Sequence, residues 1–186
     1  MIYQLRASLQ DSGPEVWRRV LVPGDATLRN LHWVLQTAIG WTNSQLHVFH
    51  VGDKKFSDPE MEVKGTKNEN KTLLKKAAPK VGQAFVYEYD LRDRWLHTVE
   101  VESVLAEDKR YQDFPVCLAG ASACPPENCG GVRGYYELQK ALANPRHPKH
   151  KDALITLGET FNPRVFLMDV VNRSLQKGWS GQYGRG

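Results

Sequence analysis

The stretch FVYEYDLRDRWLHTVEVE, residues 85–102, decides the fold class of this protein. Bulky apolar residues alternate with polar ones on both sides of a short polar break at Asp93 and Arg94. Alternation with a period of two is typical of a β-strand that buries one face, and two such runs joined by a turn predict an antiparallel hairpin. The buried face of the second strand is expected to carry Trp95, His97, Val99 and Val101.

The beginning of the chain predicts a similar hairpin. Residues 2–9 alternate like a half-buried strand, residues 11–14 form a turn sequence, and residues 16–22 return as a second strand. Residues 46–51 predict a further strand. The sheet is therefore expected to be antiparallel and built from hairpins.

A helix is predicted between these strands. Thr27 is a suitable N-cap, and Leu28 to Ile39 place apolar residues on one face at helical spacing. Gly40 is a suitable residue for the left-handed position that follows a helix.

The rest of the chain predicts irregular segments and a helical end. The charged residues 53–72 predict a long loop, residues 73–78 a short helix, and residues 107–131, which are rich in proline and glycine, an irregular stretch. Asn162 followed by Pro163 is typical of a helix start. Helices are therefore predicted over residues 135–142, 153–157 and 162–175.

Together these elements predict an α+β fold. An antiparallel sheet built from hairpins would pack with the helix after the first hairpin and with a helical C-terminal third. A chain of 186 residues suits one domain, which we expect over residues 1–178, with a flexible tail at 179–186.

Composition and charge limit where the protein works. Three cysteines are a poor disulfide framework, because the count is odd, and they are typical of a reducing compartment. The longest stretch without charged residues, from Asn30 to Gly52, holds too many polar side chains for a membrane span. The first residues lack the apolar region of a signal peptide. We therefore expect a cytoplasmic protein without a membrane partner.

The net charge is +4, and two basic clusters stand out. Basic clusters can bind phosphate backbones, but neither alternates with aromatic residues, so we interpret both as solvated surface. The first contains Lys64, Lys67, Lys71, Lys75, Lys76 and Lys80 against Glu69, and the second contains Arg146, His147, Lys149, His150 and Lys151.

A cysteine cluster is the best candidate for a metal site. Thiolates suit zinc, and an irregular loop can wrap them around it. His97 is the expected fourth ligand, with His147 and His150 as alternatives. The competing interpretation is a set of small buried thiols, with His97 hydrogen-bonded beneath the sheet. The tentative zinc ligands are His97, Cys117, Cys124 and Cys129.

Several blocks resemble the plasmid pRiA4b ORF-3-like family, some of whose members carry labels of insertion-element passenger proteins. The matching blocks run from Thr27 to Trp41, through Tyr87-x-Tyr89-Asp90-x-x-Asp93-x-Trp95-x-His97, and through Cys124-Pro125-Pro126-Glu127-Asn128-Cys129-Gly130-Gly131. Two positions depart from the family pattern. Gln45 stands where the family often has His, and Arg92 stands where it usually has Gly. The resemblance implies a single α+β domain of unestablished activity.

Three functions follow as hypotheses. The leading one is a non-enzymatic interaction module for a protein or nucleic acid, with an aromatic groove and the tentative binding residues Trp41, Asp93, Trp95 and Glu127. The first alternative is a metal-dependent, hydrolase-like enzyme that uses His97, Cys117 and Cys124, with Asp93 as base or ligand. The second alternative is a nucleic-acid-associated accessory protein of mobile elements. The sequence lacks the phosphate-binding glycine motifs and the H-E-x-x-H motif.

Overall fold

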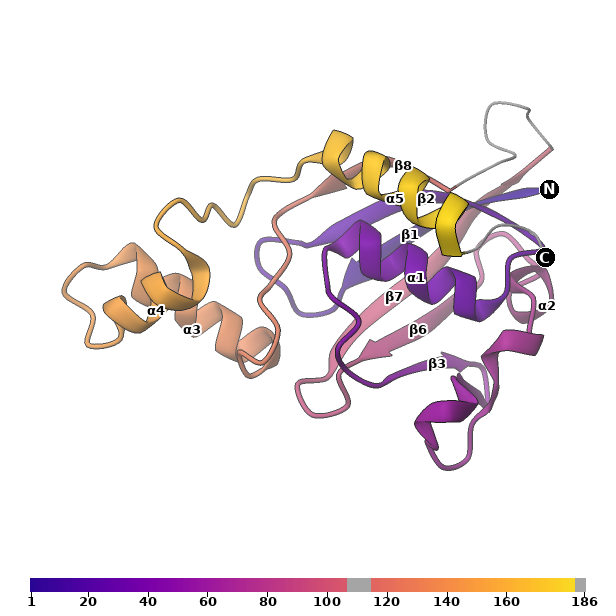
Figure 1. Cartoon of the computed structure of the whole chain (residues 1–186), viewed down its shortest axis with the longest axis horizontal. Helices are drawn as coiled ribbons and strands as arrows, with labels where there is room; N and C mark the ends of the chain where they lie inside the picture. Colours follow the sequence, from indigo (N-terminus) through magenta and orange to yellow (C-terminus); the bar gives the residue numbers. More distant parts are fainter. Residues whose placement is uncertain (107–114, 183–186) are drawn as a thin grey trace.

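The computed structural model describes residues 1–106 and 115–182. They form an α+β fold around a sheet with the strand order β5-β4-β3-β6-β7-β1-β2-β8 (Figure 1). Neighbouring strands pair antiparallel, except that β4 and β5 pair parallel. The strands are β1 (Ile2–Leu9), β2 (Trp17–Pro23), β3 (His47–Val51), β4 (Lys54–Ser57), β5 (Lys67–Asn68), β6 (Ala84–Tyr89), β7 (Trp95–Leu105) and β8 (Val116–Ala121).

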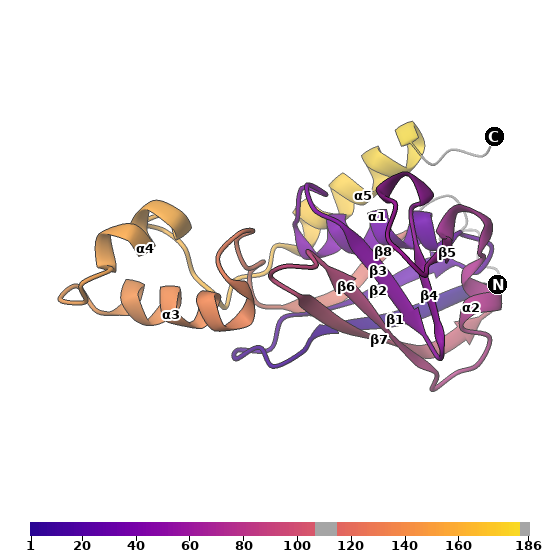
Figure 2. The ribbon, with the colours of Figure 1, turned by 90° about the horizontal axis from the view of Figure 1, so that it is seen from below.

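The helices fall into two groups. α1 (Leu28–Ile39) and α5 (Met168–Gln182) lie on the same side of the sheet, where α5 contacts α1 and β8 (Figure 2). α3 (Gly131–Ala143) and α4 (His150–Leu157) pack on each other and project beyond one end of the sheet (Figures 1 and 2). The short helical segments are η1 (Pro59–Met61), η2 (Glu69–Lys71) and α2 (Leu74–Ala77). Within the described residues, no helix is long and apolar enough to cross a membrane.

The expected hairpin of residues 85–102 is confirmed. β6 pairs with β7 in a register that places Tyr87 opposite His97 and Tyr89 opposite Trp95. Trp95, His97, Val99 and Val101 are buried, whereas Glu100 is exposed, so the buried face is the expected one. The first hairpin, β1–β2, is confirmed as well.

The expected caps of α1 are also present. The Thr27 hydroxyl accepts the backbone N–H of Asn30 at 3.2 Å, and the Asn30 side chain accepts the backbone N–H of Thr27 at 2.9 Å. Gly40 takes the left-handed conformation with φ 116°, and a Cβ there would lie 3.1 Å from the Cβ of Cys124. A side chain at position 40 is therefore disfavoured twice, by backbone strain and by the close loop.

Two segments expected to be irregular contain strands. Residues 53–72 include β4 and β5, which extend the sheet edge beyond β3. Residues 116–121 form β8 on the other edge of the sheet, although their sequence does not alternate between apolar and polar residues. They become a strand because their backbone groups pair with the otherwise unpaired edge of β2. Small residues are needed there: a Cβ on Gly120 would lie 2.8 Å from the Trp17 carbonyl oxygen. Residues 107–114, also expected to be irregular, lie outside the described residues.

The expected start of the last helix is wrong. Asn162 accepts the N–H of Arg164 with its side chain and that of Val165 with its carbonyl, which makes a turn. α5 begins only at Met168 and continues to Gln182, so the first residues of the expected tail are helical. Residues 183–186 lie outside the described residues, and the single domain over residues 1–178 stays a prediction.

Candidate functional site

The loop of residues 122–130, here called the Cys-Pro-Pro loop, docks on the end of the β6–β7 hairpin. Its Glu127 carboxylate accepts hydrogen bonds from the Tyr89 hydroxyl, from Thr42 Oγ1 at 2.6 Å and from Ser44 Oγ at 3.1 Å. The Gly130 backbone N–H donates to Asp93 Oδ2 at 2.9 Å. The loop is therefore attached to the end of the hairpin, and Glu127 and Asp93 are the acceptors that hold it there.

The two tryptophans expected to form a groove lie beneath this loop. Trp41 is 7% exposed and Trp95 is fully buried. The Trp41 ring stacks on Tyr89 with centroids 4.8 Å apart, and its Nε1–H donates to the Pro125 carbonyl at 3.0 Å. The prediction of an open aromatic groove is therefore wrong, because both tryptophan rings are buried and the Cys-Pro-Pro loop contacts Trp41.

His97 lies in the core beside these rings. Its Nδ1 is 3.1 Å from the Trp95 carbonyl oxygen, and its Nε2 has no partner among the described residues. Burial lowers the pKa of His97 to about 4, so the imidazole is neutral at physiological pH. This matches the interpretation of His97 as a histidine held beneath the sheet.

The three cysteines are free thiols. Burial raises the pKa of Cys117, and it raises the pKa values of Cys124 and Cys129 to about 12. Over residues 1–106 and 115–182, no group of three or more His, Cys, Asp or Glu side chains is arranged to hold a metal ion. The expected zinc set of these cysteines with His97 is therefore not found as a ligand group in the described part of the chain, where Cys117 lies on β8 and Cys124 and Cys129 belong to the Cys-Pro-Pro loop.

A buried polar network joins α1 to β6. Gln36 Nε2 donates to the Tyr87 hydroxyl at 2.8 Å, which leaves that hydroxyl to donate to His32 Nδ1 at 2.8 Å. His32 Nε2–H then donates to Asn43 Oδ1 at 2.6 Å. None of these residues is predicted as a site from the sequence, where the signal of the network is a histidine, His32, on the apolar face of the predicted helix.

A second buried network reaches β3 and η2. His47 Nε2 lies 2.8 Å from Glu69 Oε2, and both side chains are fully buried. Glu69 faces Arg29, which also pairs with Asp58. Burial lowers the pKa of His47 to about 3 and raises the pKa of Glu69 to about 7. These groups are enclosed and favour their neutral forms.

Arg18 was also missed by sequence reasoning. It is 1% exposed, and its five N–H groups donate to five carbonyl oxygens. Those acceptors belong to Trp17, Ala38, Ile39, Ala121 and Ser122, with N···O distances from 2.7 to 3.3 Å. The guanidinium lies 3.9 Å over the Phe166 ring. Arg18 therefore ties α1, β2 and β8 together, and every donor is used within the protein.

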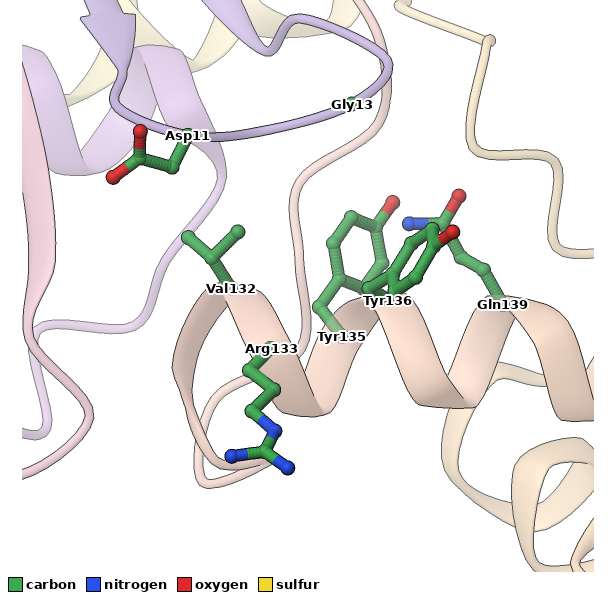
Figure 3. A pocket seen from close by; sticks show the side chains of 7 residues that line it. All are labelled: Asp11, Gly13, Val132, Arg133, Tyr135, Tyr136 and Gln139. Carbon is green, nitrogen blue, oxygen red and sulfur yellow. The ribbon is translucent and has the colours of Figure 1, made fainter.

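A pocket of about 540 Å³ lies between the β1–β2 turn and α3 (Figure 3). Figure 3 shows the side chains of Tyr135 and Tyr136 rising from α3 toward the turn that carries Gly13, while Arg133 points away from them. Tyr135 is 2% exposed, and its hydroxyl has no hydrogen-bond partner among the described residues. The lining residues are Asp11, Gly13, Val132, Arg133, Tyr135, Tyr136 and Gln139.

Sequence reasoning did not find this pocket, since its two walls are separated by more than a hundred residues. Tyr135 lies in the helix predicted over residues 135–142 and is buried in α3, but its sequence neighbours do not indicate an unpaired hydroxyl. Burial raises the pKa of Tyr135 to about 12, so the hydroxyl keeps its proton and remains a donor.

Relatives of the chain support the fold and leave the activity open. The model of the plasmid pRiA4b ORF-3-like protein family matches residues 1–170. The uncharacterised protein y4hQ of Sinorhizobium fredii (strain NBRC 101917 / NGR234) is 36% identical over 161 residues, which are 86% of this chain and 82% of that protein. The crystal structure of the protein of unknown function MM3350 from Methanosarcina mazei Go1 superimposes with a TM-score of 0.82 at 30% identity, covering 90% of this chain and 96% of that one. The chain therefore belongs to the plasmid pRiA4b ORF-3-like family.

Proposed function

We propose that the protein is a non-enzymatic, cytoplasmic binding module and that the pocket between the β1–β2 turn and α3 is its binding site. The side chains that catalysis would need are committed elsewhere. Glu127 holds the Cys-Pro-Pro loop, His97 is enclosed and neutral, and the thiols keep their protons. The three free thiols also suit a reducing compartment.

The unpaired hydroxyl of Tyr135 carries this proposal. A buried hydroxyl without a partner costs about 1–3 kcal/mol of stability, and folded proteins rarely keep one without a reason. Because Tyr135 lines a pocket, a bound molecule whose acceptor atom displaces the side chains that cover the hydroxyl can supply the missing hydrogen bond. The volume of about 540 Å³ also falls in the usual range of ligand sites.

The lining points to a short peptide segment of a protein partner. Val132 and the rings of Tyr135 and Tyr136 offer apolar surface to a side chain. The Tyr135 hydroxyl can donate to a peptide carbonyl, and the Gln139 amide can both donate to and accept from a peptide group. The lining exposes more apolar than polar surface. This is typical of ligand sites in which a small number of polar groups fix the orientation of the bound molecule.

The test is binding of capped hexapeptides from a random library to the full chain, followed by calorimetry on the selected peptides. We expect Tyr135→Phe to weaken binding about tenfold, the effect of one lost hydrogen bond. Tyr136→Phe is the matched control, since Tyr136 is half exposed and water replaces its hydroxyl contacts. Equal affinities of wild type and Tyr135→Phe, or the absence of any peptide ligand, would reject the site.

A further inference from the structure

The positive charge of this protein is concentrated in one segment. Residues 53–80 contain eight lysines and five acidic residues, a net charge of +3 out of +4 for the chain. All eight lysines are exposed. They lie on or next to the edge strands β4 and β5 and the short helical segments η2 and α2, which contact the chain around the start of α1 (Figure 2). The eight are Lys54, Lys55, Lys64, Lys67, Lys71, Lys75, Lys76 and Lys80, here called the lysine-rich end.

Tertiary structure makes this surface more positive than the sequence count implies. Two of the five acids, Asp58 and Glu69, are buried and face Arg29, which comes from α1 outside the segment. Asp53, Glu60 and Glu62 are the exposed acids, so the outward charge is +5. Within the described part of the chain, no ion pair involves any of the eight ammonium groups.

The chemistry of this surface selects its partner. Protein interfaces bury an apolar or aromatic centre. Phe56 and Leu74 face the core, and none of the exposed large hydrophobic residues of the described chain lies in the segment. Phe56 is also the segment's only aromatic residue, so no ring is available to stack on unpaired bases. Lysine side chains without stacking rings fit regularly spaced phosphates that are read by charge alone.

We propose that the lysine-rich end, most of which the sequence indicates as solvated surface, is instead a binding surface for the phosphate backbone of double-stranded nucleic acid. It lies away from the pocket at α3 and is independent of the peptide ligand proposed there. Binding is sequence-independent and salt-sensitive, because each neutralised phosphate releases counterions. At physiological salt the expected dissociation constant is about 10⁻⁴–10⁻⁶ M, and binding tightens as the salt concentration falls.

The experiment measures fluorescence anisotropy of a labelled 20-base-pair DNA duplex with the full chain at several salt concentrations. The test variant replaces Lys64, Lys71, Lys75 and Lys76 by Gln and keeps the lysines of the β4 and β5 edge strands, which protect the sheet edge from association. We expect the slope of log K against log salt to become shallower by up to about 3.6, because each lost phosphate contact contributes about 0.9.

The matched control replaces the same number of exposed lysines on the helical part of the chain. It contains Lys140→Gln, Lys149→Gln, Lys151→Gln and Lys177→Gln, so it has the same net charge and removes two lysines of the second basic cluster. We expect it to bind DNA like wild type. An equal loss in both variants would overturn the proposal, because net charge alone would then explain the binding.

Two further outcomes separate this proposal from other partners. Polyglutamate of equal charge that displaces the duplex would assign the surface to an acidic protein, and binding to phosphatidylserine vesicles at the same salt would assign it to a membrane. Either result, or no duplex binding at about 50 mM salt, overturns the proposal. Single Lys64→Gln and Lys76→Gln variants, each expected to change the slope by about 0.9, keep the test decisive if the fourfold variant does not fold.

Discussion

The imidazole rings of His32 and His47 stack in the core with their centroids 3.6 Å apart and their planes within 10° of parallel. Burial and the neighbouring His47 lower the pKa of His32, and burial and Arg29 lower the pKa of His47. Two cations cannot share this enclosed position, so the pair is a neutral packing element. His97 is enclosed in the same way near Trp41.

Acid is therefore expected to destabilise the fold. An unfolded histidine takes up its proton near pH 6.5, whereas folded His97 has a pKa of about 4, so the unfolded state binds more protons between these values. His97 contributes stability above pH 6.5, and up to roughly 3 kcal/mol of it is lost as pH falls toward 4. Urea unfolding from pH 4 to 8 measures this slope. His97→Phe should flatten it, and a His147→Gln control with an equally flattened curve would contradict the assignment.

Glu69→Gln is expected to show the opposite trend. Burial raises the pKa of Glu69 from 4.5 to about 7, so the folded state holds the extra proton and wild type loses stability as pH rises through this range. The amide cannot ionise. As pH rises from about 4.5 to 8, the free energy of unfolding of the variant should therefore increase relative to that of wild type by up to about 3 kcal/mol. Thermal unfolding of both proteins over this range is the measurement, and a constant difference would show that Glu69 is charged throughout.

Arg18→Lys is expected to cost about 3–5 kcal/mol in free energy of unfolding. One ammonium group cannot reach five carbonyl oxygens that a planar guanidinium serves, so several buried acceptors lose their partners. Arg6→Lys is the control, because its partner Glu15 is exposed and the expected change is within about 0.5 kcal/mol. Urea unfolding compares them. Similar losses in free energy of unfolding for the two variants would mean that the hydrogen bonds of Arg18 contribute little to stability.

The contact between Tyr89 and Glu127 is expected to hold the Cys-Pro-Pro loop. A double-mutant cycle with Tyr89→Phe and Glu127→Gln should give a coupling energy of about 1–2 kcal/mol, since the partly buried carboxylate accepts from the hydroxyl of a buried tyrosine. The exposed pair Lys140 and Glu137 serves as control, with an expected coupling below about 0.5 kcal/mol. Chemical denaturation measures both cycles. A coupling near zero for the first would leave the loop anchored by other contacts.

Tyr135→Phe is expected to be as stable as wild type or up to about 1 kcal/mol more stable. The change removes a buried hydroxyl without a partner and keeps the ring. Tyr89→Phe, which removes a bonded hydroxyl, should instead lose stability. Urea unfolding distinguishes the two. A loss of more than about 1 kcal/mol for Tyr135→Phe would show that its hydroxyl is bonded in the folded protein and would remove the support for the pocket as a binding site.

Local patterns in the sequence determined those elements whose conformation and ends depend on residues a few positions away. The alternation from Phe85 to Val101 specifies a strand, a turn and a returning strand, because side chains on a strand alternate between faces whatever lies opposite. Thr27 and Gly40 specify the ends of α1, because a cap bonds to backbone groups within one turn.

Tertiary structure decided what depends on residues distant in the chain. β8 is a strand because β2 pairs with it, and the chain before α5 stays non-helical where Phe166 packs on the Arg18 guanidinium. The same holds for the candidate sites. Trp41 is closed off by Pro125, and the pocket exists because α3 faces the turn at Gly13. Periodicity and capping act over a few residues, whereas burial and pocket shape depend on which distant surfaces meet.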